Sequence, residues 1–157
     1  MSIDPNCKLI FLDIDGVLND HRFNEQSQSG TMLPECVERL NRILTATDAR
    51  IVLSSAWRYM LIGRAMSVTG FDYLLRTHGV IANRLVGRTC ADEEVKERGW
   101  QIHEWRKTNN HRGRYVVIDD MDLHISPLHP LILVDGSIGL EDSAVDAAIV
   151  HLNGGRD

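Results

Sequence analysis

The sequence predicts an α/β fold, a three-layer Rossmann-like sandwich built around a mostly parallel sheet. Short apolar runs typical of buried strands alternate with segments whose apolar residues recur at helical spacing. This alternation is typical of parallel strands joined by crossover helices. The strand-like runs are residues 9–12, 51–53, 115–118 and 131–134. Because 157 residues suit one domain, we expect residues 1–157 to form a single domain.

The helices between these runs are predicted from apolar periodicity. Four segments show it: residues 34–47, 60–68, 91–108 and 141–152. Pro34 suits the first turn of a helix, and Gly70 should stop the second one. Residues 80–82 and 85–86 fit either short strands or a packed loop, and the polar residues 21–31 fit an exposed loop.

Composition and charge limit the classes of function. Hydrophobic residues make up 43% and charged residues 25%, as in ordinary globular proteins. The formal net charge of −5 argues against a general nucleic-acid or membrane-surface binder, although a local basic patch is compatible with it. Cys7, Cys36 and Cys90 are far apart and odd in number, which predicts reduced thiols in a cytoplasmic protein. The chain shows no signal peptide and no long apolar run, so we expect no membrane association.

Two carboxylates directly follow the first strand. Asp13 and Asp15 are separated by one apolar residue, and Gly16 then allows a sharp turn. Neighbouring ionised carboxylates repel each other, and partial burial raises that cost. Mg²⁺ prefers hard oxygen ligands and would relieve the repulsion. An EF-hand loop is excluded, because its sixth and twelfth positions would hold Leu and Asn instead of Gly and Glu.

Two other strands also end in polar pairs. The run 51–53 ends in Ser54 and Ser55, and the run 115–118 ends in Asp119 and Asp120. Ligands of open α/β sheets bind beyond the carboxyl ends of the strands, so three polar endings at that edge predict a functional site. The hydroxyls can donate to phosphate oxygens or cap a following helix. The seven histidines lack the spacing of a metal pair, and zinc is not predicted.

These motifs resemble those of the haloacid dehalogenase-like (HAD) phosphohydrolases. The first, second and fourth family motifs are matched by Phe11–Leu18, Ile51–Ser54 and Val117–Asp120. Residues 51–58 and 98–102, with Gly139 and Leu140, are similar to a compact branch grouped with RNA-repair-associated phosphatase domains. The resemblance spans most of the chain. The spacing between the motifs leaves no room for a separate cap domain.

The resemblance implies a Mg²⁺-dependent phosphomonoester hydrolase that acts through an aspartyl-phosphate. Asp13 would be the nucleophile, and Asp15 would protonate the leaving oxygen and then activate water. The third-motif cation would be Arg98, which the branch favours, or Lys96, which the wider family favours. Substrate contacts are implied for Ser54, Ser55, Arg58 and Gly16. The metal would be held by Asp13, the Asp15 backbone carbonyl and one acid of the pair that follows residue 118, namely Asp120 rather than Asp119.

The partner implied is a phosphorylated substrate, with a nucleotide or a nucleic-acid end as the first candidate. This substrate is favoured by the absent cap, the branch and a cluster of basic residues, namely Arg106, Lys107, Arg112 and Arg114. A phosphoprotein or a small metabolite stays open, as does an oligomer. The alternative function is a non-catalytic phospho-acceptor or binding module. Receiver domains end a middle strand in one acceptor aspartate, whereas here that strand ends in Ser54 and Ser55.

Overall fold

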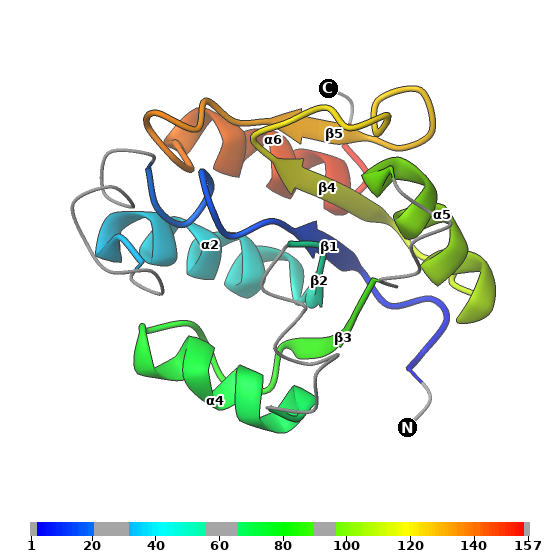
Figure 1. Ribbon diagram of the computed structural model, residues 1–157, viewed down its shortest axis with the longest axis horizontal. Coiled ribbons are helices and arrows are strands. Elements are labelled where there is room, and N and C mark those ends of the chain that lie inside the picture. Colours follow the sequence, from blue (N-terminus) through cyan, green and yellow to red (C-terminus); the bar gives the residue numbers. More distant parts are fainter. Residues whose placement is uncertain (1–2, 21–31, 56–65, 90–96, 156–157) are drawn as a thin grey trace.

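The computed structural model describes residues 3–20, 32–55, 66–89 and 97–155. Within them, five parallel strands form one sheet in the order β3-β2-β1-β4-β5, which Figure 1 shows. The strands are β1 (Leu9–Leu12), β2 (Arg50–Leu53), β3 (Leu85–Arg88), β4 (Tyr115–Asp119) and β5 (Leu131–Leu133). The α/β prediction is confirmed, and every pairing among these strands is parallel.

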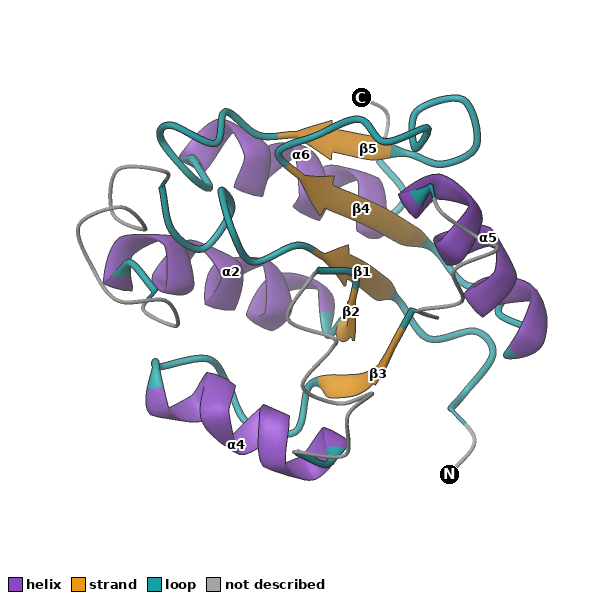
Figure 2. Ribbon diagram, in the orientation of Figure 1, coloured by secondary structure: helices purple, strands orange, loops and turns teal. Residues whose placement is uncertain are grey.

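Helices cover both faces of the sheet (Figure 2). The described residues contain α2 (Pro34–Thr47), α4 (Val68–Thr77), α5 (Arg98–Thr108) and α6 (Asp142–Leu152). Ile10 and Leu12 of β1 belong to a buried cluster that includes residues of α2, α4 and α6. Leu9 and Phe11 point to the opposite face and pack in a second cluster with Ile102 of α5. Alternation along β1 therefore separates the two faces, and α5 is the described helix on the second one.

Two helix predictions differ from the structure within the described residues. α4 begins at Val68 and runs through Gly70, which the sequence predicted as a stop. Ser67 caps this helix by accepting the Gly70 N–H at 3.0 Å, so the glycine lies in the first turn. α5 begins at Arg98, because Glu97 remains extended with φ −93° and ψ 138°. The upstream parts of both predicted helices, 60–65 and 91–96, lie outside the described residues.

Residues 80–86, which the sequence left as either short strands or a packed loop, contain the start of one strand, β3. Residues 80–82 form no strand, whereas β3 begins at Leu85. Asp72 of α4 accepts backbone N–H groups from Asn83, Arg84 and Leu85 at 2.8–3.1 Å. A buried carboxylate in α4 therefore fixes the entry to β3 through long-range bonds.

Two expectations about the whole chain can be compared with the described residues. Cys7 and Cys36 carry free thiols, and Cys90 lies outside the described ranges. In the part of the chain that the structure describes, no helix is both long enough and apolar enough to cross a membrane. The polar segment 21–31 also lies outside it.

Candidate active site

A row of polar residues crosses the carboxyl edge of the sheet. Pairing sets Leu12 opposite Leu53 on one side and Ile118 on the other, and the next residue of each strand extends the row. Its members, from β3 to β4, are Thr89, Ser54, Asp13 and Asp119. Backbone hydrogen bonds continue the ladder at this level, with Ser54 N–H donating to the Leu12 carbonyl at 2.8 Å. Because in-register side chains share a face, the row lies on the α5 side.

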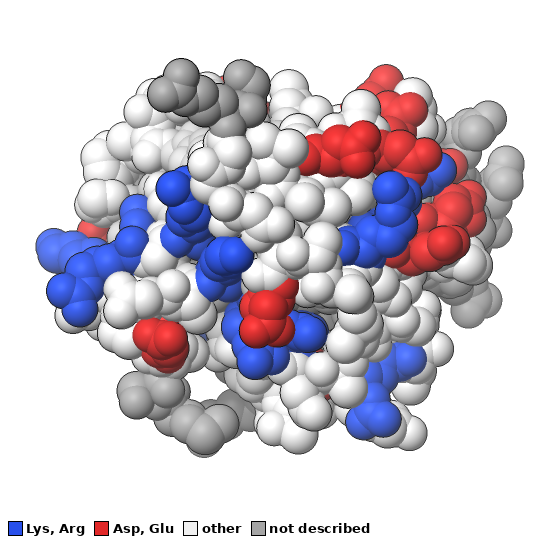
Figure 3. Space-filling view, turned by 180° about the vertical axis from the view of Figure 1, so that it is seen from behind, with Lys and Arg blue, Asp and Glu red and all other residues white. Residues whose placement is uncertain are grey.

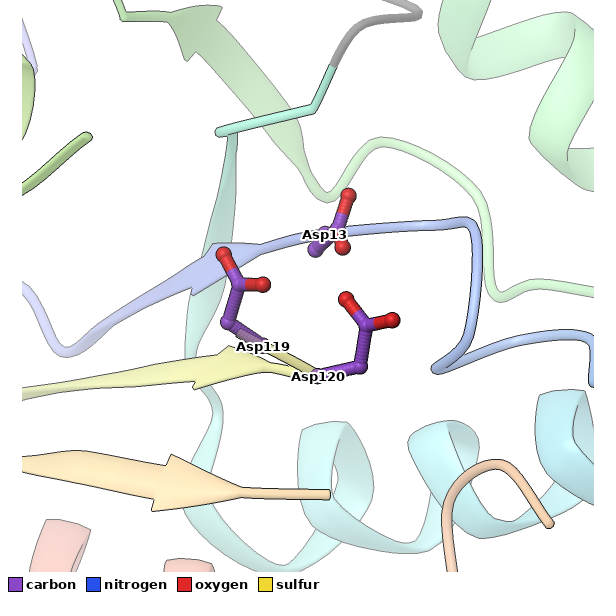
Figure 4. A group of neighbouring side chains, drawn as sticks. All are labelled: Asp13, Asp119 and Asp120. Atoms are coloured by element: carbon purple, nitrogen blue, oxygen red, sulfur yellow. The ribbon is translucent and has the colours of Figure 1, made fainter. Parts of the chain in front are cut away.

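Three carboxylates converge between the ends of β1 and β4, as Figure 4 shows. Oxygens of Asp13, Asp119 and Asp120 all lie within 4.8 Å of one another. Gly16 closes one side of this group with φ +83°, and a Cβ there would lie 2.6 Å from Asp120 Cγ. Only glycine adopts this backbone readily and leaves room for Asp120.

Arg98 brings a positive charge to the carboxylates. Its Nη1 lies 2.5 Å from Asp119 Oδ2 and 3.5 Å from Asp13 Oδ2. The Arg98 side chain is 15% exposed, so water screens these contacts only weakly. Of the two cations considered for this role, Arg98 is in contact with Asp13, whereas Lys96 lies outside the described residues.

Burial makes the carboxyl groups of Asp13 and Asp119 hard to ionise. Burial first, and then the negative charge of Asp119, raises the pKa of Asp13 to about 9, although Arg98 partly offsets the rise. Burial also raises the pKa of Asp119 against the opposing effect of Arg98. A carboxylate group of this kind suits a divalent cation, which would restore the ionised forms. The oxygens of these side chains are of the hard type that Mg²⁺ prefers as ligands.

Asn19 braces the turn that carries Asp15. Its side-chain amide donates to Asp15 Oδ1 at 3.2 Å, and its Oδ1 accepts the Gly16 N–H at 2.9 Å. Asn19 is fully buried, whereas Asp15 is half-buried. The Asp15 side chain is not one of the three clustered carboxylates, and Asn19 fixes its direction separately from them.

Two hydroxyls of the row have no hydrogen-bond partner among the described residues. Ser54 and Thr89 are 1% and 0% exposed, and neither Oγ of Ser54 nor Oγ1 of Thr89 is bonded there. Buried hydroxyls are normally satisfied, and leaving one without a partner costs about 1–3 kcal/mol. Such groups at a carboxyl edge are suited to bind an oxygen-rich ligand.

The structure brings together seven of the ten residues predicted for the site, namely Asp13, Asp15, Gly16, Ser54, Arg98, Asp119 and Asp120. Ser55 directly follows Ser54 and is buried. Arg58 and Lys96 lie outside the described residues. Asn19 and Thr89 were missed. Asn19 stands in the first motif and Thr89 directly follows β3, a strand that the sequence left undecided.

The basic cluster proposed as substrate support lies away from the site. Arg106 and Lys107 are in the last turn of α5, and Arg112 and Arg114 precede β4, at the amino ends of the strands. An 11-residue helix is about 16 Å long, so α5 separates them from Arg98. Arg106 instead stacks 3.9 Å from the Tyr115 ring centre. On the face in Figure 3, Lys and Arg form small groups interspersed with Asp and Glu.

Comparison with known proteins gives one family match. A family model described as the HAD domain in Swiss Army Knife RNA repair proteins matches residues 9–145. The matched range includes all five strands and every site residue named above. No curated protein and no solved structure matches the chain.

Proposed function

Because this chain belongs to the HAD domains of Swiss Army Knife RNA repair proteins, a family of the phosphatase-type hydrolase superfamily, we propose that it is a Mg²⁺-dependent phosphomonoesterase. One observation carries the proposal: a buried aspartate at the end of the central strand touches an arginine and two further carboxylates. Asp13 is the nucleophile in this proposal, and the guanidinium of Arg98, which lies 3.5 Å from it, supports that role. We further propose that residues 1–157 act as one domain without a separate cap.

The residues fit a resident Mg²⁺. Asp13 and Asp120 would bind it through side-chain oxygens, and Asp15 through its backbone carbonyl. Asp119 already accepts from Arg98 at 2.5 Å and from the Met121 N–H at 3.0 Å, which suits it to orient Arg98 rather than bind metal directly. When bound, the ion would neutralise carboxylate and phosphoryl charge.

The protein groups can then divide the reaction between them. An Asp13 oxygen attacks phosphorus while the bond from phosphorus to the alcohol oxygen breaks, and Asp15 gives its proton to that oxygen. Water next attacks the aspartyl-phosphate, Asp15 takes the proton, and inorganic phosphate leaves with Asp13 restored. Arg98 and the Ser54 hydroxyl would hold the phosphoryl oxygens in line.

The substrate we propose is a phosphorylated nucleic-acid end or a nucleotide. The family description, which names RNA repair proteins, supports this class. The net charge of −5 and the distant basic cluster give it no support, since phosphate backbones are bound mainly by Lys and Arg. Discrimination between a polymer end and a mononucleotide is therefore the decisive measurement.

The test is phosphate release from 3′- and 5′-phosphorylated oligonucleotides, matching mononucleotides, phosphopeptides, sugar phosphates and an aryl phosphate, each in Mg²⁺ and in EDTA. We expect metal-dependent release, with a higher kcat/KM for an oligonucleotide than for its mononucleotide and a steep loss with salt. Equal, salt-insensitive values would contradict the polymer end. No metal-dependent release from any substrate would favour a phospho-acceptor or binding module.

A further inference from the structure

Gly99, the second residue of α5, is held on three sides by the segment 121–129. Its N–H donates to the Leu123 carbonyl at 3.1 Å, and its own carbonyl lies 2.8 Å from His129 Nε2. Its Cα packs against the backbone of His124, where a Cβ on Gly99 would lie 2.6 Å from the carbonyl carbon. The first turn of α5 is thus fixed to this segment by two hydrogen bonds and a contact that only glycine permits.

His129 is suited to hold a backbone carbonyl permanently. It is 6% exposed, and its Nδ1 lies 2.9 Å from the Tyr115 hydroxyl. Nε2 must donate to the Gly99 carbonyl, so Nδ1 is left to accept from Tyr115, which defines the neutral Nε2–H tautomer. Burial first, and also the charge of Arg106, lowers the pKa of His129, although the bond to Gly99 opposes this.

The segment that holds Gly99 also carries the acid pair. It follows Asp120 directly, and its first residue, Met121, donates its N–H to Asp119 Oδ1 at 3.0 Å. Arg98 is the first residue of α5, the helix whose Gly99 carbonyl is bonded by His129 at the end of the segment. The Arg98 guanidinium lies 2.5 Å from Asp119. Residues 119–129 and the start of α5 therefore form a closed loop of contacts around the site.

From these contacts we propose that His129 is a positioning residue, which acts through Gly99 to keep the Arg98 guanidinium against Asp13 and Asp119. The inference rests on the proposed phosphatase function, in which Arg98 meets the transferred phosphoryl group. Among the described residues, His129 makes no direct contact with the three carboxylates or with Arg98. Its effect should therefore appear in the rate of the chemical step, because a displacement of about 1 Å in a catalytic group costs roughly a hundredfold in rate.

His111 provides a matched control. It is 5% exposed, its Nε2 lies 2.8 Å from the Cys7 carbonyl, and its ring lies 6.1 Å from that of Tyr115, against 5.8 Å for His129. Burial, the bond from Nε2 to a carbonyl and the packing on Tyr115 are thus alike. His111 differs in that its Nε2 holds the N-terminal segment instead of Gly99, and its Nδ1 accepts from Arg106 Nε at 3.2 Å, at the end of α5 far from Arg98. The experiment compares His129→Phe, His129→Gln and His111→Phe by kcat, KM and urea midpoint.

We expect both Phe variants to shift the urea midpoint by similar amounts, and His129→Phe alone to lower kcat, by about tenfold or more. His129→Gln places an amide N–H near the Nε2 position and should recover most of the rate. If His129→Phe does not fold, Tyr115→Phe, which removes only the hydroxyl that orients His129, should lower kcat less strongly. Unchanged kcat in His129→Phe, or in Tyr115→Phe where His129→Phe does not fold, would overturn the proposal, and so would equal kcat losses in His129→Phe and His111→Phe.

A binding measurement separates this inference from the proposed function. If the wild type turns over no substrate, the phosphatase proposal fails, and Mg²⁺-dependent binding of orthovanadate becomes the readout. A loss of vanadate affinity in His129→Phe that matches the loss in Arg98→Met, with His111→Phe unaffected, would sustain the positioning role. Unchanged affinity in His129→Phe, or no binding by the wild type, would overturn it.

Discussion

Replacing Asp13 with Asn should stabilise the metal-free protein while abolishing turnover. Asn keeps the shape of the side chain and can still accept the Ile14 N–H, which lies 2.9 Å from Asp13 Oδ1. It cannot act as a carboxylate nucleophile, so activity should fall by several orders of magnitude. The gain in stability arises because the buried carboxyl is held protonated in the fold but ionises freely on unfolding.

The magnitude follows from the pKa of Asp13, about 9 in the folded protein. An unfolded aspartate has a pKa of about 3.9, and each pH unit above it favours unfolding by about 1.4 kcal/mol until the folded group also ionises. The upper limit of the gain from Asn is therefore about 5 kcal/mol at pH 7.5 and about 1–2 kcal/mol at pH 5. Because the folded pKa is raised, the contribution of Asp13 to stability is full below about pH 4 and declines as pH rises towards 9.

Urea unfolding in EDTA at pH 5, 6.5 and 7.5 measures this difference. The stability of Asp13→Asn relative to wild type should rise with pH, and added Mg²⁺ should stabilise the wild type but not the variant. Asp48→Asn is the control, and its stability relative to wild type should change with pH in the opposite direction. The reason is that hydrogen bonding to Arg84 lowers the pKa of exposed Asp48. If Asp13→Asn is no more stable than wild type at pH 7.5, or its gain is independent of pH, the reasoning about burial is refuted.

Two further predictions concern the neighbours of Asp13. Asp120→Asn should raise the Mg²⁺ concentration needed for half-maximal turnover more than Asp119→Asn does, and a titration that ranks the two variants in the reverse order would exchange their assignments. Thr89→Val should raise the free energy of unfolding by about 1 kcal/mol, because it removes a buried hydroxyl without a partner in the described residues. Thr47→Val, which loses a 2.7 Å bond to the Ile43 carbonyl, should instead be destabilised in the same urea assay, and equal effects would contradict this account.

The central part of the site could be predicted because its residues follow strands that are easily recognised. Asp13, Ser54 and Asp119 each stand at the end of an apolar run, and parallel strands bring such ends to one edge. Because side chains alternate along a strand, the two acids at the end of β4 face different ways. Asp119 lies in the row with Asp13, whereas Asp120 lies against Gly16.

The remainder depends on contacts that local patterns do not contain. β3 has four residues, and its start is fixed by Asp72 from a different element. Gly70 was predicted to stop a helix, because the helix cap at Ser67 was not recognised. The basic cluster was taken as support for a nucleic-acid substrate, because charge alone does not tell which end of a helix lies near the site. Gly99 and His129 meet across thirty residues, and the motif at residues 98–102 does not indicate this contact.

The polar row at the carboxyl edge can form only late in folding, because its residues come from distant parts of the chain. Asp13 leaves the ribosome early, whereas Asp119 and Asp120 follow only after most of the chain has been made. Until β4 docks beside β1, Asp13 stays at an open strand edge, without the two acids that complete the proposed metal site. Long-range pairing of this kind forms slowly relative to local helices. Tight binding of Mg²⁺ would therefore mark the docking of the C-terminal strands, and a chain truncated before residue 119 would lack it however well its first half folds.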